Sequence, residues 1–364
     1  MSRTLVLTGA TGLVGTAVTA ALLPAFDRAL VLTTGDRDPE TASIRAKVAA
    51  VLEATGDDPG HARHLQSLAL RDADGAALAR LGFGTVAQVW NIGATLSYDM
   101  DRLRHTVDAN AAAPVRLLRL CRPQERFFQV STVGVTGPGD PGRTPSLVLE
   151  EPVWDVDAVN PYVVSKVLAE HMLDGLRERE GHPVTSLRVG SVIGPAGHRP
   201  VQANRAGYYT LVEMIAKVRS RGATLTLDIA ETLAPPLVHV DQLAASCASL
   251  AERAAAEAEV SAYYHLGDQR LRNGEAIDAV NAALGGDVLA IGAPRTALDR
   301  GFASVNADNV AFMSCPFVFD HRNVDSQVPA AARPRVDATS FAGFVTAQLE
   351  FGGRRGRART AAAA

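Results

Sequence analysis

The chain has few cysteines, no long apolar run and no strong excess of charge. Its three cysteines among 364 residues (Cys121, Cys247, Cys315) lie far apart and match no metal-ligand or disulfide spacing, which is typical of a reducing compartment. No stretch approaches the ~20 apolar residues of a membrane span, and no signal peptide precedes the first strand. A net charge of −3 argues against nucleic acid as the main partner. We therefore expect a cytoplasmic protein without a metal centre that binds neither membranes nor nucleic acid.

Short apolar strands alternate with helices in the N-terminal half. Six strands are expected, at 4–9, 29–34, 65–70, 85–94, 126–135 and 184–190. The helices between them are expected at 13–23, 43–55, up to about 81, 101–121 and 160–181. Continuous apolar strands separated by helices indicate a parallel sheet that is covered on both faces. The sequence therefore predicts an α/β fold of the Rossmann type, a doubly wound parallel sheet.

This alternation stops after Gly190. Residues 191–235 read as loops around one helix, and 269–350 add further helices, so these segments are expected to form a smaller C-terminal lobe that binds the substrate. The apolar runs 236–241 and 262–268 are expected to return to the sheet. The dinucleotide-binding body would then comprise 1–190 with 236–268. The last residues, 351–364, rich in glycine, arginine and alanine, are expected to be a flexible tail.

The segment "TGATGLVG" lies between the first strand and the first helix. Gly9, Gly12 and Gly15 have the spacing G-x-x-G-x-x-G. Glycines let the backbone turn tightly and approach a pyrophosphate, which the helix N-terminus then binds. The turn predicts a dinucleotide site, to which we assign its remaining members Thr11, Leu13 and Val14.

The end of the second strand favours NADP over NAD. An acidic residue there would accept hydrogen bonds from the ribose hydroxyls of NAD, but the strand ends in Thr33, Thr34 and Gly35. Arg37 follows, within reach of a 2′-phosphate, whereas Asp36 would favour NAD if its loop folded back. We expect NADP(H), with Thr33 and Arg37 among its ligands.

The segment "NPYVVSKVLAE" (160–170) places a tyrosine and a lysine on one face of a helix. Asn160 and Pro161 suit the N-cap and the first helical position, and Tyr162 and Lys166 are four residues apart. Only three of the 36 basic residues are lysines (Lys47, Lys166, Lys217). A lysine here therefore suggests a need for a compact ammonium, although a simple hydrogen bond at the surface is the alternative.

Together these motifs resemble those of the extended short-chain dehydrogenase/reductase superfamily. The glycine turn, "VSTVGV" (130–135) and "YVVSK" (162–166) follow in the same order and on the same elements, over residues 4 to about 270. The resemblance implies that Tyr162 is the general acid/base, that Lys166 lowers its pKa and holds the nicotinamide ribose, and that Thr132, rather than its neighbour Ser131, binds the substrate oxygen. Asn110 matches an asparagine of a family helix.

The same resemblance implies further cofactor contacts. "NIGAT" (91–95) is similar to the segment that lines the cofactor after the fourth strand, so Gly93 and Ala94 are candidates, and Asp72 after the third strand is another. The chemistry also needs the lysine, because the ordinary tyrosine pKa near 10 is too high for easy proton exchange at pH 7. A nearby ammonium lowers it.

Finer features resemble the thioester reductase branch of that superfamily, which includes carboxylic acid reductases and fatty acyl reductases. They are the segments 89–120 and "VFDHRNVDSQVP" (318–329). The resemblance implies an NADPH-dependent reductase of a thioester or of a related aldehyde or ketone. Since neither a carrier nor an adenylation domain precedes the first strand, the thioester is expected on a separate carrier protein or on coenzyme A.

Two other functions stay open. A nucleotide-sugar epimerase or another sugar-modifying enzyme has the same fold, although the family's dehydratases carry Asp-Glu where this chain has Val133 and Gly134. The lobe contains several arginines that could bind a sugar diphosphate or a phosphopantetheine phosphate equally well: Arg199, Arg205, Arg219, Arg221, Arg270 and Arg272. The alternative is that they form a solvated face. A dinucleotide sensor without activity is the third possibility, but such proteins typically lose the tyrosine or the lysine.

The sequence assigns no specific role to two tyrosines and two histidines. Tyr208 and Tyr209 fit a substrate pocket and ordinary packing equally well. His239 and His265 lie on expected strands, where we expect core residues rather than catalysts. The sequence leaves the oligomeric state, monomer or dimer, open.

Overall fold

A seven-stranded parallel sheet forms the centre of the protein. The computed structural model describes residues 2–33, 41–137, 139, 146–154, 156, 160–196 and 207–362, with side chains up to residue 351. The strands follow the order β11-β7-β5-β4-β1-β2-β3. Their bounds are β1 (Thr4–Thr8), β2 (Arg28–Thr33), β3 (Leu65–Ala69), β4 (Gln88–Asn91), β5 (Arg126–Thr132), β7 (Val184–Val189) and β11 (Tyr263–Leu266). All six predicted strands are present, and the doubly wound sheet is confirmed.

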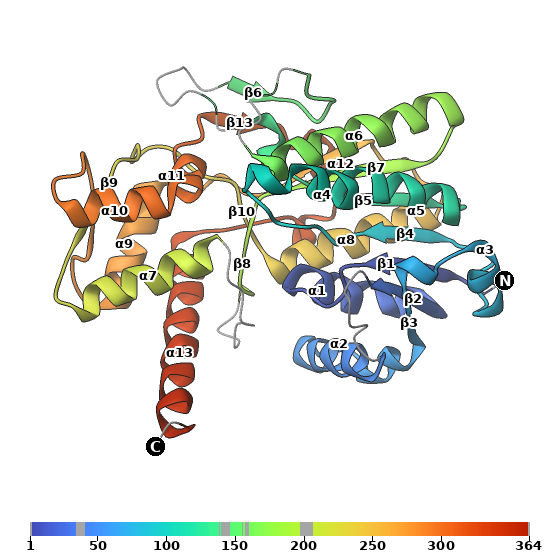
Figure 1. Cartoon of the computed structure of the whole chain (residues 1–364), viewed down its shortest axis with the longest axis horizontal. Helices are drawn as coiled ribbons and strands as arrows, with labels where there is room; N and C mark the ends of the chain where they lie inside the picture. Colours follow the sequence, from blue (N-terminus) through green and yellow to red (C-terminus); the bar gives the residue numbers. More distant parts are fainter. Residues whose placement is uncertain are drawn as a thin grey trace.

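Helices cover both faces of this sheet (Figure 1). One face carries α1 (Leu13–Leu22), α2 (Thr41–Thr55) and α8 (Val240–Ala255), and the other α3 (Gly75–Arg80), α4 (Leu103–Val107), α5 (Ala113–Cys121) and α6 (Pro161–Glu180). Side chains alternate along a strand, so Leu5 and Leu7 of β1 join the first layer and Val6 the second. Both layers are apolar, which explains the continuous apolar runs in the sequence.

The predicted helix 101–121 is not one regular helix. A 3₁₀ turn (Met100–Arg102) leads into α4, a π-helical segment (Asp108–Ala112) follows, and α5 completes the run. Single π turns inside helices are frequent at functional sites. Asn110 lies within this one.

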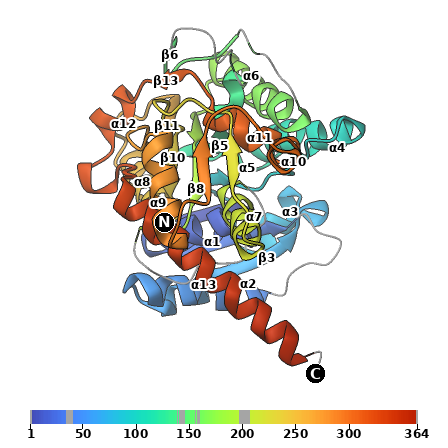
Figure 2. The same cartoon turned by 90° about the vertical axis from the view of Figure 1, so that its left-hand side faces the viewer.

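The C-terminal part forms a second layer of helices with short strand pairs (Figures 1 and 2). Its helices are α7 (Tyr208–Ser220), α9 (Asn273–Leu284), α10 (Ala297–Val305), α11 (Ala307–Met313) and α13 (Ala338–Ala362). The short helix α12 (Arg322–Gln327) instead packs beside β11 on the body, where Val324 joins the core of the sheet. Three parallel pairs join β8 (Ser191–Ile193) to β10 (Leu237–His239), β9 (Leu225–Leu227) to β12 (Leu289–Ile291), and β6 (Ser146–Val148) to β13 (Phe317–Phe319). Apolar side chains from α7, α9 and α13 fill its core.

Two expectations for this part need correction. The run 262–268 does return to the sheet, as β11, but the run 236–241 does not, because β11 occupies the edge beside β7 and β10 pairs with β8 instead. The residues expected to be a tail continue α13 as far as Ala362.

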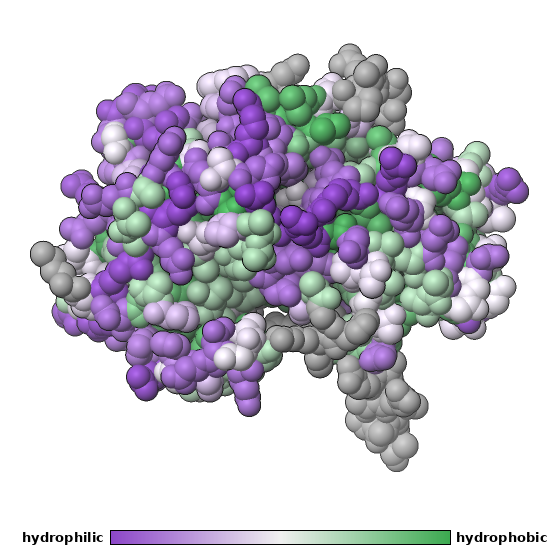
Figure 3. All heavy atoms as spheres, turned by 180° about the vertical axis from the view of Figure 1, so that it is seen from behind, coloured by the Kyte–Doolittle hydropathy of each residue, from purple (hydrophilic) through white to green (hydrophobic). Residues whose placement is uncertain are grey.

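Apolar side chains gather at the top of the molecule in Figure 3, where β6 and β13 lie in Figure 1. Leu147 and Val318 are paired across these strands and are 62% and 49% exposed. Among the described residues, no helix is both long and apolar enough to cross a membrane. No group of three or more His, Cys, Asp or Glu in the same part of the chain could hold a metal ion.

Candidate active site

The glycine turn after β1 is built for a close approach of backbone to ligand. Gly9 has a φ of +75°, which favours glycine, and a Cβ there would overlap the backbone of Gly93. A Cβ at Gly15 would overlap the carbonyl oxygen of Gly9, whereas Gly12 faces outward with no atom within 3.4 Å of such a Cβ. Gly12 is also the N-cap of α1, and no side chain caps this helix. Helix amides in such a cradle fit a pyrophosphate.

Thr11, Leu13 and Val14 complete this turn, with Thr11 exposed and the other two partly buried.

The carboxyl ends of the seven parallel strands lie at the edge where this turn is found. Since β1 and β4 are neighbours and the chain winds away from them in both directions, this edge is the switch point where such folds bind ligands. Gly93 and Ala94 follow β4, and the Gly93 amide donates to the Thr8 hydroxyl at 3.1 Å. Asp72 follows β3 and is exposed.

The residues that would distinguish NADP from NAD are only partly described. Thr33 is buried at the end of β2. Arg37 and Asp36 lie outside the described residues, so the preference for NADP stays a prediction.

Tyr162 and Lys166 lie in the first two turns of α6. The Asn160 side chain accepts from the Val163 amide at 3.0 Å, and Pro161 is the first helical residue, as the sequence predicts. Lys166 is 1% exposed, and its Nζ donates to the Val130 carbonyl at 2.7 Å. Burial lowers the pKa of Lys166 to about 8, although the Glu170 carboxylate acts in the opposite direction. The surface alternative for this lysine is therefore wrong.

Thr132, rather than Ser131, faces the tyrosine. A side-chain hydrogen bond joins Thr132 to the Tyr162 phenol, and the Thr132 hydroxyl also accepts from the Gly134 amide at 3.1 Å. The Ser131 hydroxyl instead donates to Glu170 at 2.5 Å in the interior. Because side chains alternate along a strand, the hydroxyls of Ser131 and Thr132 in β5 lie on opposite faces of the sheet.

The pKa of Tyr162 is raised in this structure rather than lowered. Burial has the largest effect, Tyr98 adds to it, and the hydrogen bond from Thr132 acts in the other direction. Lys166 Nζ lies 5.8 Å from the centroid of the tyrosine ring and is bonded to the main chain of β5. In this geometry, therefore, Lys166 does not lower the pKa of Tyr162 as the sequence led us to expect.

Asn110 connects the cofactor edge to the catalytic helix. Its amide exchanges two hydrogen bonds with the backbone of Thr95, at 2.7 and 2.9 Å, and donates to the Ser165 hydroxyl at 2.9 Å. It is 1% exposed. We therefore regard it as a positioning residue that holds the loop after β4 against α6.

A buried ionic network behind Lys166 has no counterpart in our sequence-based prediction. Glu170 accepts from Ser131 and from Arg188 on β7, whose Nη2 lies 2.8 Å from the carboxylate. Arg188 also donates to Nε2 of His265 at 3.3 Å, and Nδ1 of His265 bonds the Asp320 carbonyl at 2.8 Å. The only signal in the sequence is the spacing of Lys166 and Glu170, one helical turn apart.

His239 and His265 are both buried, as expected for core residues. Burial, with the nearby Arg188, lowers the pKa of His265 to about 3, so this histidine is neutral.

Tyr98 is a further residue at the site that the sequence does not single out. Its ring meets the ring of Tyr162 edge to face, with centroids 6.3 Å apart and planes at 71°. Partial burial and the carboxylate of Asp308 on α11 both raise the pKa of Tyr98. Helix α11 of the C-terminal lobe is therefore close enough to Tyr98 for its charge to act on this residue.

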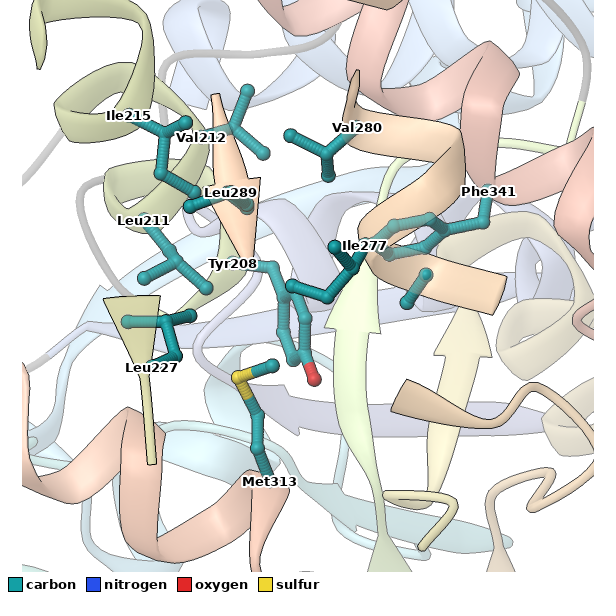
Figure 4. Close-up of a pocket in the computed structure, with 11 residues that line it drawn as sticks. Tyr208, Leu211, Val212, Ile215, Leu227, Ile277, Val280, Leu289, Met313 and Phe341 are labelled. Carbon is teal, nitrogen blue, oxygen red and sulfur yellow. The ribbon is translucent and has the colours of Figure 1, made fainter. Parts of the chain in front are cut away.

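Tyr208 and Tyr209 are core residues of the lobe. They are 3% and 0% exposed and meet Phe341 and Phe344 of α13 edge to face. Figure 4 shows Tyr208 in a small apolar cavity between α7, α9 and α13, with its hydroxyl beside Met313. Of the lobe's arginines, Arg270 pairs with Asp268 and Arg219, Arg221 and Arg272 are exposed, while Arg199 and Arg205 lie outside the described residues.

The sequence matches the model of one protein family, described as the NAD dependent epimerase/dehydratase family, over residues 5–264. The chain belongs to this family. It is an NAD(P)-dependent enzyme of the extended short-chain dehydrogenase/reductase type, and the resemblance seen in its motifs is confirmed. Its cofactor is a nicotinamide dinucleotide. No curated protein sequence matches the chain.

Several solved structures of this epimerase/dehydratase fold are similar along nearly the whole chain. The terminal R domain from the myxalamid PKS-NRPS biosynthetic pathway is 22% identical, with a TM-score of 0.74 over 98% of this chain and 91% of that one. DesIV, a dTDP-glucose 4,6-dehydratase from Streptomyces venezuelae with NAD and TYD bound, is also 22% identical, with a TM-score of 0.64 over 96% and 98%. UDP-glucuronic acid 4-epimerase from Bacillus cereus in complex with NAD is 16% identical, with a TM-score of 0.62 over 96% of both chains. At these identities the likeness concerns the fold.

Proposed function

We propose that this enzyme is a cytoplasmic NADPH-dependent reductase of an acyl thioester, bound to a separate carrier protein or to coenzyme A, or of a related aldehyde or ketone. The observation that carries the proposal is the arrangement of Thr132, Tyr162 and Lys166 at the edge where the glycine turn lies. Thr132 and Tyr162 are hydrogen-bonded to each other, and a carbonyl oxygen placed between them would accept from both.

Each side chain has a task in this reaction. The bound nicotinamide supplies the hydride. The Thr132 hydroxyl holds the substrate oxygen, and the Tyr162 phenol donates the proton that this oxygen needs as it becomes an alkoxide. With a thioester, the resulting hemithioacetal then releases the thiol of the carrier or of coenzyme A and leaves the aldehyde. Burial keeps the phenol neutral in this structure, so Tyr162 holds the proton that it would donate, and an ammonium brought close to the phenol would lower its pKa and ease that transfer. Lys166 would turn from the Val130 carbonyl to the ribose and the phenol.

The residues after Thr132 support reduction over dehydration. Val133 is 2% exposed and packs against Cys315 and Phe319 of the lobe. The next residue, Gly134, donates its amide to Thr132. These positions offer no carboxyl group for the removal of water. The likeness to a terminal R domain over 98% of the chain also favours a reductase.

A nucleotide-sugar epimerase is the alternative, favoured by the family match and by the sugar enzymes among the similar structures. One experiment separates the two. The purified protein is incubated with NADPH and acyl-coenzyme A, acyl-carrier or aldehyde substrates and, in parallel, with NAD⁺ or NADP⁺ and UDP-sugars, and absorbance at the NADPH band and product mass are followed. We expect NADPH oxidation with a thioester or aldehyde. An epimerised sugar without net NADPH consumption would overturn the proposal.

The choice of NADPH is tested separately by titration of both reduced cofactors, with binding followed by their fluorescence. We expect tighter binding of NADPH, and Arg37→Ala should reduce that preference. Tighter binding of NADH would instead assign the ribose to Asp36.

A further inference from the structure

Three large apolar side chains are exposed in the segment that brings Tyr98 to Tyr162. Leu96, Tyr98 and Met100 are 56%, 52% and 59% exposed, whereas Ser97 between the first two is buried. The backbone has no regular secondary structure from Ile92 to Asp99. Leu96 and Tyr98 flank the buried Ser97, and both are open to solvent. Exposed apolar side chains that cluster in this way mark binding surfaces.

This apolar segment is continuous with the candidate active site. It begins at Leu96, two residues after the cofactor candidate Ala94, near the switch point of the sheet. Tyr98 contacts the ring of Tyr162 edge to face, at 6.3 Å between centroids, within the range of a favourable aromatic pair. A substrate whose carbonyl lies at Tyr162 would therefore have this segment beside it.

The charge near Tyr98 favours a neutral occupant. The Asp308 carboxylate on α11 acts electrostatically on Tyr98. A sugar diphosphate on this surface would face a like charge and leave the apolar side chains without a partner. A hydrocarbon chain would cover them.

We propose that Leu96, Tyr98 and Met100 bind the hydrocarbon chain of the substrate, so that the enzyme acts on medium- or long-chain acyl groups. This inference rests on the proposed function and names its substrate class. Complete burial of one methylene is worth about fourfold in binding. Because one side of a chain on an open surface stays in water, we expect about twofold per methylene.

The test is the dependence of kcat/KM on chain length, measured with NADPH and coenzyme A thioesters from butyryl to dodecanoyl. The wild type should prefer dodecanoyl over butyryl by on the order of 100-fold. In Tyr98→Ser and in Leu96→Ser/Met100→Ser the ratio should fall below about tenfold, while Tyr98→Phe, which keeps the ring, should retain it. Because this is a ratio of two kcat/KM values, a loss of activity that affects all substrates equally does not change it.

Leu168→Ser/Met172→Ser is the matched control, because these side chains are 39% and 40% exposed on the same helix as Tyr162 but farther along it. This control should keep the wild-type ratio. Equal kcat/KM for all chain lengths in the wild type, or an unchanged ratio in the Ser variants, would overturn the inference while leaving the reductase proposal intact.

A binding measurement distinguishes failure of the proposed function from failure of this inference. Straight-chain alcohols from hexanol to decanol are titrated calorimetrically into the protein in the presence of NADP⁺. Affinity that rises with chain length in the wild type but not in Tyr98→Ser supports the apolar site even if no thioester is reduced. Affinity that does not depend on chain length contradicts it.

Discussion

Arg188 donates to both carboxylate oxygens of Glu170, one helical turn after Lys166, and all three side chains are buried. Nε lies 3.2 Å from each oxygen, and Nη2 lies 2.8 Å from one of them. The pair joins the catalytic helix α6 to strand β7 and, through His265, to the segment before α12. A structural ion pair and the catalytic lysine thus share one environment.

Glu170→Gln should be strongly destabilising, because it leaves the buried guanidinium of Arg188 without its counter-charge. Removal of one partner of a buried pair typically costs 3–5 kcal/mol, so we expect a loss of about 3 kcal/mol in urea denaturation. The pKa of Lys166 should also fall further, since Glu170 raises it. Glu178→Gln, on the exposed side of the same helix, should change stability by less than about 0.5 kcal/mol. Equal stability of the two variants would contradict this account.

Thr132→Val should lower kcat by about 100-fold, on the scale of losing one donor to the developing oxyanion. NADPH binding should be nearly unchanged, and Thr132→Ser should restore most of the rate. Ser131→Ala removes the hydroxyl on the opposite face, which bonds Glu170, so it should lower stability more than kcat. Single-turnover kinetics and thermal denaturation check both effects. Turnover of Thr132→Val at the wild-type rate would move the oxygen-binding role elsewhere.

The sequence was sufficient for the sheet and for the residues at its edge. Strands such as β1 and β2 are almost continuous apolar runs, and the glycine turn and the Tyr162–Lys166 spacing are local patterns that can be recognised without the fold. The edge strand β11 was predicted for the same reason.

The lobe could not be predicted to this degree. Strands of three residues, such as β6 and β13, have no periodicity that distinguishes them from loops. These two strands also pair with each other across 171 residues of sequence, from Ser146 to Phe317. The contacts of Glu170 and Tyr98 could not be predicted either. The partner of Glu170, Arg188, lies on another element, and Tyr98 comes close to Tyr162 only in the folded chain.

Tyr208→Phe should leave stability unchanged or raise it by up to about 1 kcal/mol, because it removes a buried hydroxyl that has no hydrogen-bond partner among the described residues. Tyr264→Phe is the matched control. Its hydroxyl donates to Gln327 at 2.5 Å and accepts from the Ser261 amide at 2.8 Å, so its loss should cost about 1–3 kcal/mol. Urea denaturation of both variants decides the point. Similar losses would indicate a bound water beside Tyr208.

Glu150→Gln should change the pH dependence of stability. Glu150 accepts from the amides of His265 and Asn323, at 2.9 and 2.6 Å, and burial raises its pKa to about 7 from 4.5. A raised folded-state pKa means that its contribution is present below pH 4.5 and is lost as the pH rises through 7. The difference in unfolding free energy, variant minus wild type, should therefore increase by up to about 3 kcal/mol between these pH values. Glu151→Gln, at an exposed neighbour, should show no such increase, and a flat difference for Glu150→Gln would refute the assignment.

The central prediction concerns Tyr162 and Lys166. Tyr162→Phe removes only the phenolic oxygen, so the fold and NADPH binding should persist while reduction stops or nearly so. Lys166→Arg keeps the charge, but the buried space around Nζ, 2.7 Å from the Val130 carbonyl, suits a compact ammonium rather than a planar guanidinium. We expect slower reduction together with weaker NADPH binding, whereas Lys217→Arg, on the exposed side of α7, should behave as wild type.

The pH profile of these variants tests the role of the lysine further. Since the pKa of Lys166 is about 8, the lysine loses its proton as the pH rises through 8, and an arginine does not. The alkaline limb of kcat/KM should therefore lie near pH 8 in the wild type and move upward in the remaining activity of Lys166→Arg. Stopped-flow measurements of NADPH oxidation from pH 6 to 10 would show it. Wild-type kinetics and an unchanged pH profile in Lys166→Arg would mean that this ammonium takes no part in the proton transfer, and the reductase assignment would lose the residue pair on which it was built.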